Sequence, residues 1–127
     1  MNGYKSKVAE ASKPLSVEER IKLKDTSDAI SLDLATQEMD ELILNVELYA
    51  VLDIHNEKAE DKDYNQYIFV TTSGDKYVTG SESLWNAFNA IADELEDEGI
   101  TTIPPIKIYR KESKNYKGKQ FITCSLA

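Results

Sequence analysis

Residues 41–54 read ELILNVELYAVLDI and place an apolar side chain at every second position from Leu42 to Ile54. A period of two predicts a β-strand with one face buried and the other in water. The run is much longer than the usual strand of about five or six residues. We therefore expect this strand to bend, as the strands of a barrel do.

A β-hairpin is predicted directly after this strand and an acidic loop. Residues 64–72 are rich in the aromatic and β-branched side chains that favour sheets, and residues 76–79 predict a short return strand. Between them, Ser73-Gly74-Asp75 supplies a tight turn in which the glycine can take a positive φ.

One helix is predicted next, beginning at Ser81 or Ser83 and ending at Gly99. Its broad apolar face consists of Leu84, Trp85, Phe88, Ile91, Ala92 and Leu95. Pro104 and Pro105 then return the chain to an extended course, because proline does not continue a helix. Two last strands are predicted, the first over residues 106–109, where Ile106 and Ile108 alternate with Lys107 and Tyr109, and the second over residues 121–126.

The predicted order is therefore strand, strand, strand, helix, strand, strand. This order, with a long first strand, is typical of the OB-fold, a five-stranded Greek-key barrel. We expect a mostly β fold of this kind, an OB-like β-barrel domain with one helix, over residues 28–127. An α+β sandwich and an SH3-like barrel with an inserted helix are the competing folds.

Residues 1–27 are expected to form a flexible N-terminal tail, because they mix charged and polar residues without a sustained apolar stripe. The segment Ser16-Val-Glu-Glu19 has the pattern of a capping box, so a short helix can begin there. The chain has no apolar run long enough to span a bilayer and no signal-like N-terminus, and we expect a cytoplasmic protein with no membrane association.

Charge is unevenly distributed along the 127 residues, whose formal net charge is −8. Residues 81–100 carry six acids and no base, whereas residues 101–127 carry six bases against Glu112 alone. Because exposed charges more than about 10 Å apart are largely screened at 0.1 M salt, a polyanion can bind the basic end locally.

The segment from residue 107 to residue 119 indicates a nucleic-acid contact. It interleaves bases with two tyrosines in a predicted hairpin loop, and the candidate residues are Lys107, Tyr109, Arg110, Lys111, Lys114, Tyr116, Lys117 and Lys119. Lysines neutralise phosphates and tyrosines stack on bases. The alternative is that the lysines protect a sheet edge from aggregation.

A second candidate surface is the hairpin formed by residues 64–79. If Ile68, Val70 and Val78 point inward, then the side chains of Tyr67, Phe69 and Tyr77 point outward. Flat rings on an exposed sheet are suited to stacking with unpaired bases. The alternative is that Tyr67 and Phe69 form a small core under a loop or under the N-terminal tail.

Two short segments resemble the small single-stranded-DNA-binding proteins of phages that infect Gram-positive bacteria. They are Thr79-Gly-Ser-Glu-Ser-Leu84 and Ser113-Lys-Asn-Tyr-Lys-Gly-Lys-Gln-Phe121. The resemblance implies an OB-fold that coats replication or recombination intermediates, with the basic hairpin on the strand. Many such proteins have an acidic C-terminal tail, which this sequence lacks, so we do not expect recruitment of host proteins through such a tail.

Catalysis has little support, and we expect neither an enzyme nor a cofactor or metal. His55 is the only histidine and is expected to lie in solvent, while Cys124 alternates with apolar residues as a core residue does. We expect a non-catalytic protein that binds single-stranded DNA or RNA, as a monomer or a dimer, with a host or phage replication protein as a further partner. The alternative is an acidic protein-binding inhibitor or adaptor of the DNA-mimic type.

Overall fold

The long strand predicted over residues 41–54 is divided at Asn45 into β3 (Glu41–Leu44) and β4 (Val46–Asn56). The computed structural model describes residues 3–113 and 118–127. The remaining elements, in chain order, are β1 (Tyr4–Ala11), α1 (Val17–Lys24), β2 (Ile30–Ser31), α2 (Leu32–Glu38), β5 (Asp63–Thr71), β6 (Lys76–Thr79), α3 (Glu82–Asp97), β7 (Ile106–Glu112) and β8 (Gln120–Leu126). The chain is mostly β, as predicted.

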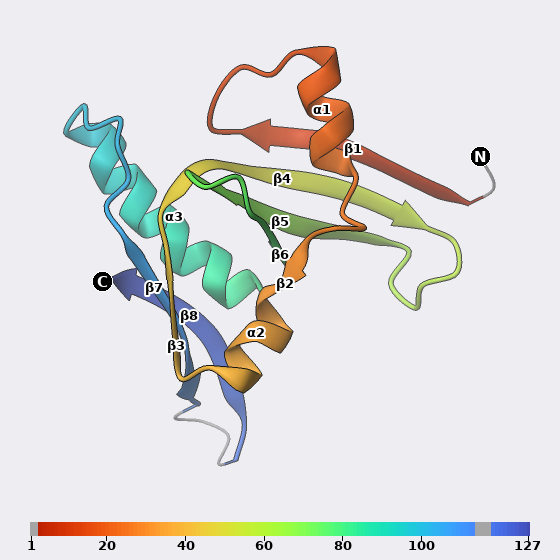
Figure 1. Cartoon of the computed structure of the whole chain (residues 1–127). Helices are drawn as coiled ribbons and strands as arrows, with labels where there is room; N and C mark the ends of the chain where they lie inside the picture. The colour runs from red at the N-terminus through yellow and green to blue at the C-terminus, as the bar shows by residue number, and fades with distance from the viewer. Residues whose placement is uncertain (1–2, 114–117) are drawn as a thin grey trace.

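The strands form two sheets, which Figure 1 shows with α3 beside them. One sheet has the order β1-β4-β5-β6-β2 and the other the order β3-β7-β8. Because β3 and β4 are separated by Asn45 alone, one continuous stretch of chain passes from the smaller sheet into the larger. In the described part of the chain β6 pairs with β5 and β2 and not with β8, so the two sheets do not close into a barrel.

The apolar stripe from Leu42 to Ile54 does not stay on one face, which corrects the expectation from its period of two. The pairing of β4 with β5 shifts its register between Val46 and Leu48. A shift of one residue exchanges the two faces of a strand. Leu44 and Val46 therefore pack in one core, whereas Leu52 and its alternating neighbours pack in another.

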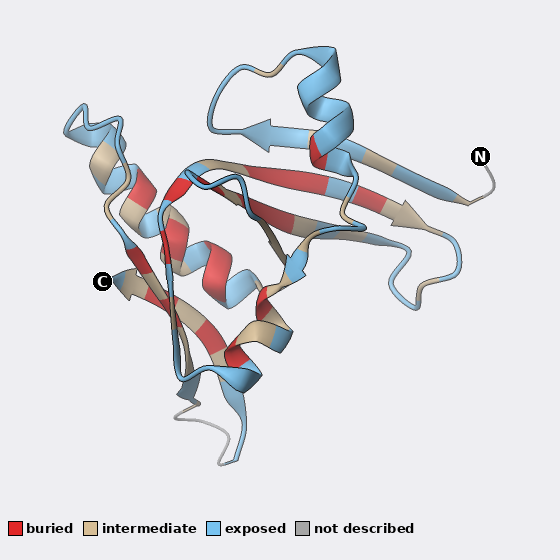
Figure 2. Cartoon of the chain, in the orientation of Figure 1, coloured by how far each residue is buried: buried red, intermediate tan, exposed pale blue. Residues whose placement is uncertain are grey.

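Two hydrophobic cores result, one on each face of the larger sheet. The main core unites both sheets with α3 and α2, and its largest fully buried side chains include Phe69, Phe88 and Leu84. The second core lies under α1 and consists of Leu23, Ala50, Leu52, Ile54 and Ile68. Figure 2 shows the buried residues concentrated along the central strands and along one side of α3.

The N-terminal segment belongs to the fold, which corrects the expectation of a flexible tail over residues 1–27. Strand β1 pairs with β4 from Tyr4↔Asn56 to Ala11↔Ala50, and α1 buries Leu23 to an exposure of 3%. The capping box predicted at Ser16 and Glu19 is confirmed at the start of α1. The strand was missed because it is an edge strand joined through its backbone, and most of its side chains are exposed.

Helix α3 agrees with its prediction. Ser81 is its N-cap and accepts a hydrogen bond from the backbone N–H of Leu84, and Gly99 follows its end with a φ of +70°. Ser83 instead donates a hydrogen bond to the carbonyl of Ile122 on β8, at 2.8 Å. None of the helices in the described ranges is long and apolar enough to cross a membrane.

Candidate nucleic-acid interface

The outer face of the β3-β7-β8 sheet carries bases and aromatic rings. On β7, Ile106 and Ile108 are buried in the main core, so the side chains between and after them point to the other face. In the pairing with β8, Tyr109 lies opposite Thr123 and Lys111 lies opposite Phe121. We call Lys107, Tyr109, Lys111 and Phe121 together the basic face.

The ammonium group of Lys107 lies on this face and has two neighbours, a carboxylate and an aromatic ring. Its Nζ lies 5.3 Å from the centroid of the Tyr109 ring and 3.8 Å from Oε1 of Glu41 on the neighbouring strand β3. The cation–π contact holds the lysine along the ring. Lys111 is exposed, and Tyr109 and Phe121 are each partly exposed. The face therefore offers an exposed base and two accessible rings.

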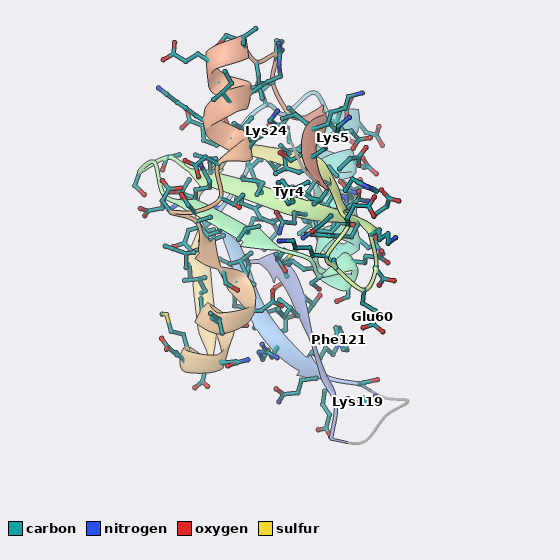
Figure 3. All side chains as sticks on the ribbon, turned by 90° about the vertical axis from the view of Figure 1, so that its right-hand side faces the viewer. Tyr4, Lys5, Lys24, Glu60, Lys119 and Phe121 are labelled. Atoms are coloured by element: carbon teal, nitrogen blue, oxygen red, sulfur yellow. The ribbon has the colours of Figure 1, made fainter. Side chains whose placement is uncertain are left out.

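The pairing of β7 with β8 extends beyond the strand ends. The backbone N–H of Ser113 donates to the carbonyl of Lys119 at 2.9 Å, next to the pair Glu112↔Gln120, and Gly118 has a φ of +82°. Figure 3 shows Lys119 directly before the start of β8 and Phe121 within that strand. Of the predicted contacts, Lys114, Tyr116 and Lys117 lie outside the described residues.

Arg110 has a different environment from the other predicted bases. Its Nε donates to Oγ1 of Thr36 at 3.1 Å, and its second terminal nitrogen donates to the carbonyl of Asp33 at 2.7 Å. Both partners belong to α2, so Arg110 ties that helix to β7. A guanidinium committed to two hydrogen bonds has less capacity for a phosphate, and the structure does not bring Arg110 together with the basic face.

Tyr67 and Phe69 are buried, with exposures of 5% and 1%, which corrects the expectation that they point to solvent. Tyr67 stacks on Trp85 of α3 with ring centroids 4.8 Å apart, and Phe69 meets Phe88 edge-on at 4.9 Å. Tyr77 is half-buried against the same core. The alternation of residues along β5 is as predicted, but α3 covers the face that was expected to be free.

The sequence does contain a signal for this burial. The apolar face of α3 needs a sheet face to pack on, and the run Tyr67–Val70 is apolar at every position. Continuous apolar runs are typical of strands that are buried on both faces. With Ile68 in the second core and its neighbours in the main core, β5 is such a strand.

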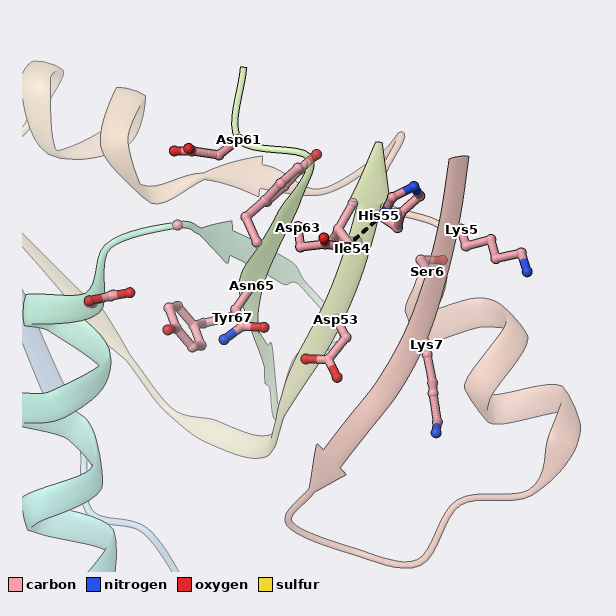
Figure 4. A pocket seen from close by; sticks show the side chains of 13 residues that line it. Lys5, Ser6, Lys7, Asp53, Ile54, His55, Asp61, Asp63, Asn65 and Tyr67 are labelled. Carbon is pink, nitrogen blue, oxygen red and sulfur yellow. Dashed lines mark hydrogen bonds and ion pairs between the residues drawn. The ribbon is translucent and has the colours of Figure 1, made fainter. Parts of the chain in front are cut away.

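A polar groove of about 620 Å³ lies where β1, β4 and β5 extend beyond the main core, and sequence reasoning missed it. Figure 4 shows Lys5 and Lys7 from β1, Asp53 and His55 from β4, and Asp63 and Asn65 from β5 lining this groove. Across the strands, Lys7 lies opposite Asp53 and Asp53 opposite Asn65. Only the unexpected pairing of β1 brings its lysines to this site.

His55 is held between two carboxylates at the rim of the groove. Its Nδ1 lies 2.7 Å from Oδ1 of Asp63, and its Nε2 lies 2.6 Å from Oε1 of Glu57. The hydrogen bonds to Asp63 and then to Glu57 raise the pKa of His55, and the bond to His55 followed by that to Lys62 lowers the pKa of Glu57. The ring is half-exposed but engaged on both nitrogens.

Among the described residues, no group of three or more His, Cys, Asp or Glu is arranged to hold a metal ion. Cys124 is buried in the main core, as predicted, and burial raises the pKa of its thiol to about 11. Comparisons of the chain with protein-family models, with curated proteins and with solved structures gave no match.

Proposed function

We propose that this protein binds single-stranded nucleic acid, without chemistry, on the basic face and the adjoining β7–β8 hairpin. The observation that carries the proposal is that Lys111, Tyr109 and Phe121 share one accessible sheet face, with Lys119 directly before β8. Stacking of an unpaired base on an aromatic ring is worth about 1–3 kcal/mol and tolerates any base. Phosphate contacts by lysines add affinity that falls with salt.

The arrangement of charge supports this location. The acidic end of α3, from Asp93 to Glu98, and the β4–β5 loop lie at other corners of the molecule than the end of β7 and the start of β8 in Figure 1. The field of a protein with a net charge of −8 repels a polyanion elsewhere and leaves the basic face as the favourable approach. The alternative of a DNA-mimic inhibitor would require the acidic β4–β5 loop to present free carboxylates like a row of phosphates. The carboxylates of Glu57 and Asp63 at this loop instead bind His55.

We also infer that the fold is an open relative of the OB-fold. The support is the continuous stretch β3–β4, which joins the two sheets, and the helix that lies in the sequence between the pairs β5–β6 and β7–β8. The missing feature is the pairing of β6 with β8, because β2 pairs with β6 instead. The resemblance of residues 79–84 and 113–121 to phage single-stranded-DNA-binding proteins makes DNA replication or recombination the process in which to test the activity first.

The test is fluorescence anisotropy of labelled oligo-dT, with oligo-U in parallel, at several salt concentrations. We expect Lys111→Glu to weaken binding about tenfold at about 50 mM salt and to lower the salt slope by about 0.7 for each phosphate that the protein no longer neutralises. We expect Tyr109→Ala to weaken binding with an unchanged slope, because stacking releases no counterions.

The matched control is Lys58→Glu, the same charge reversal at an exposed lysine of the β4–β5 loop. It should leave the affinity nearly unchanged. The proposal is wrong if neither oligonucleotide binds the wild-type protein at about 50 mM salt, or if Lys58→Glu weakens binding as much as Lys111→Glu does.

A further inference from the structure

A second groove, of about 760 Å³, lies between α3, the end of β1 and the loop that leads to β7. Its apolar lining comes from Tyr49 on β4, from Trp85, Ala92 and Leu95 on α3, and from Ile100 and Ile103 in the loop. Ile100 is 49% exposed, so the apolar lining extends to the surface. This groove is distinct from the basic face and from the polar groove around His55.

The rim of this groove is acidic. Glu10 and Glu96 line it from opposite sides, and Glu47 pairs across the rim with Lys13 at 3.9 Å. Desolvation, followed by the charges of Glu96 and Asp93, raises the pKa of the Tyr49 hydroxyl. A complementary surface therefore needs apolar side chains flanked by cations.

The solvent face of α1 has this composition. Val17, Arg20, Ile21 and Lys24 follow one another at helical spacing, so they share one face of the helix. Val17 and Ile21 are 63% and 62% exposed, whereas Leu23 on the other side is buried in the second core. Figure 2 shows α1 exposed over nearly its whole surface. The two aliphatic side chains form a small exposed apolar patch on one short helix, which is available to a partner surface.

We propose that α1 of one copy docks into this second groove, which we call the apolar groove, of a second copy. Val17 and Ile21 would cover Trp85, Leu95 and Ile100, with Arg20 and Lys24 facing Glu10 and Glu96. A helix of eight residues is about 12 Å long, which makes this a small contact and a weak one. The contact does not depend on nucleic acid.

The helix that matches the groove in composition is α1, and it must come from a second copy. The reason is that α1 cannot reach the groove of its own chain while it is docked on the second core. Leu23 holds α1 on the second core, against Leu52 and Ile68. The groove lining of Tyr49 and Trp85 belongs to the main core, on the opposite face of the same sheet. Helix α1 would have to expose Leu23 to enter its own groove.

The contact joins two different surfaces, so each copy keeps one α1 and one groove available for a further copy. Such a head-to-tail contact extends into a chain or closes into a ring, whereas a symmetric contact stops at a dimer. The expected behaviour is an average mass that continues to rise above the dimer as the protein concentration increases.

The test uses two variants that each damage one of the two surfaces. Ile21→Glu places an acid on the α1 face, and Ile100→Lys places a cation in the groove; both positions are exposed, so the fold is retained. Sedimentation velocity should show each variant as a monomer. A mixture of the two should form one-to-one pairs that do not grow, because one intact α1 meets one intact groove.

Trp85 gives a second measurement, because it is the only tryptophan of the chain and lines the groove. Its emission should shift to shorter wavelength when the wild-type protein associates and when the two variants are mixed. Leu34→Glu is the matched control, at an α2 residue with the same 63% exposure as Val17, and should associate like the wild type. A wild-type protein that stays monomeric, or variants that fail to pair, would overturn the proposal.

Discussion

Phe69 and Phe121 lie on strands of different sheets and in different surroundings. Phe69 contacts Trp85 and Phe88 in the main core, with ring centroids 6.0 and 4.9 Å away. Phe121 lies opposite Lys111 on the basic face and is half-exposed. The same residue type therefore has a packing role at one position and a proposed binding role at the other.

These two positions form a matched pair for mutation. We expect Phe69→Ala to lower the free energy of unfolding by about 3–5 kcal/mol, because it leaves a cavity in a closely packed core. Phe121→Ala should cost about 1 kcal/mol or less in stability and should instead weaken binding of oligo-dT. Urea denaturation and anisotropy on both variants check this; equal losses of stability would contradict the two environments.

His55 makes stability depend on pH in a direction that can be worked out. Its folded pKa is raised above the usual 6.5, so its contribution is fully present below pH 6.5 and is lost as the pH rises through the folded value. The folded pKa of Glu57 is lowered below the usual 4.5, so its contribution is lost as the pH falls through that lower value. On the neighbouring strand β1, Lys5 is the register partner of His55.

We expect His55→Gln to destabilise the protein more at pH 5.5 than at pH 8.5, because glutamine cannot carry the charge that binds Asp63 and Glu57. Thermal melts of both proteins at the two pH values measure the effect. A gap in melting temperature that is the same at both values would show that the ring contributes through neutral hydrogen bonds alone.

At the level of single residues, sequence reasoning succeeded where one face of an element is buried. The buried side of α3, its Ser81 cap and the core position of Cys124 followed from spacing. It failed for Tyr67 and Phe69 because alternation along a strand assigns faces and does not say which face is covered. Helix α3 covers that face, and its position over β5 depends on the tertiary structure, which the alternation does not determine.

Helix α1 is the element whose role differs most from the sequence expectation. One buried side chain, Leu23, attaches it to the second core, and its capping box satisfies the first backbone N–H groups. Lys76 of β6 donates to the carbonyls of Lys22 and Asp25, both at 2.7 Å, at the end of the helix. These contacts make α1 a docked element.

We expect Leu23→Ala to lower the free energy of unfolding by about 2–5 kcal/mol, the usual range for a buried leucine. A flexible tail would be insensitive to this change. The control is Ile21→Ala on the same helix, which removes an exposed side chain and should change stability by about 0.5 kcal/mol or less. Urea denaturation of both variants measures the difference; a silent Leu23→Ala would mean that α1 is not docked in solution.

Strands β5 to β8 and helix α3 could be predicted from sequence because each has a clear period and a turn residue at its end. Gly74, with a φ of +91°, marks the turn between β5 and β6 as expected. Strands β1 and β2 could not, because they join the sheet by backbone pairing and show little apolar alternation. The register shift in β4 was also hidden, since its residues continue the same alternation across the shift.

In the whole molecule, the two proposed interaction surfaces carry opposite charge. The basic face lies on the smaller sheet. The apolar groove, with its acidic rim, lies between α3 and the β1 end of the larger sheet. A nucleic-acid strand bound to the basic faces of several copies would hold these copies close together. This raises their effective concentration for the weak contact between α1 and the apolar groove. The candidate binding site could be located from the charge pattern of residues 107–119, whereas the groove could not, because it depends on where β1 lies.

Strand β1 also determines which part of this protein is presented to its neighbours as a sheet edge. With β1 in place, the outer strand carries Lys5, Lys7 and Glu10 and has a register shift between Val8 and Glu10, features that discourage edge-to-edge aggregation. Without it, β4 would become the outer strand, with Leu48, Ala50, Leu52 and Ile54 along one side. A chain shortened at its start would therefore be prone to form insoluble aggregates during expression, even though every residue of the proposed binding surface would still be present.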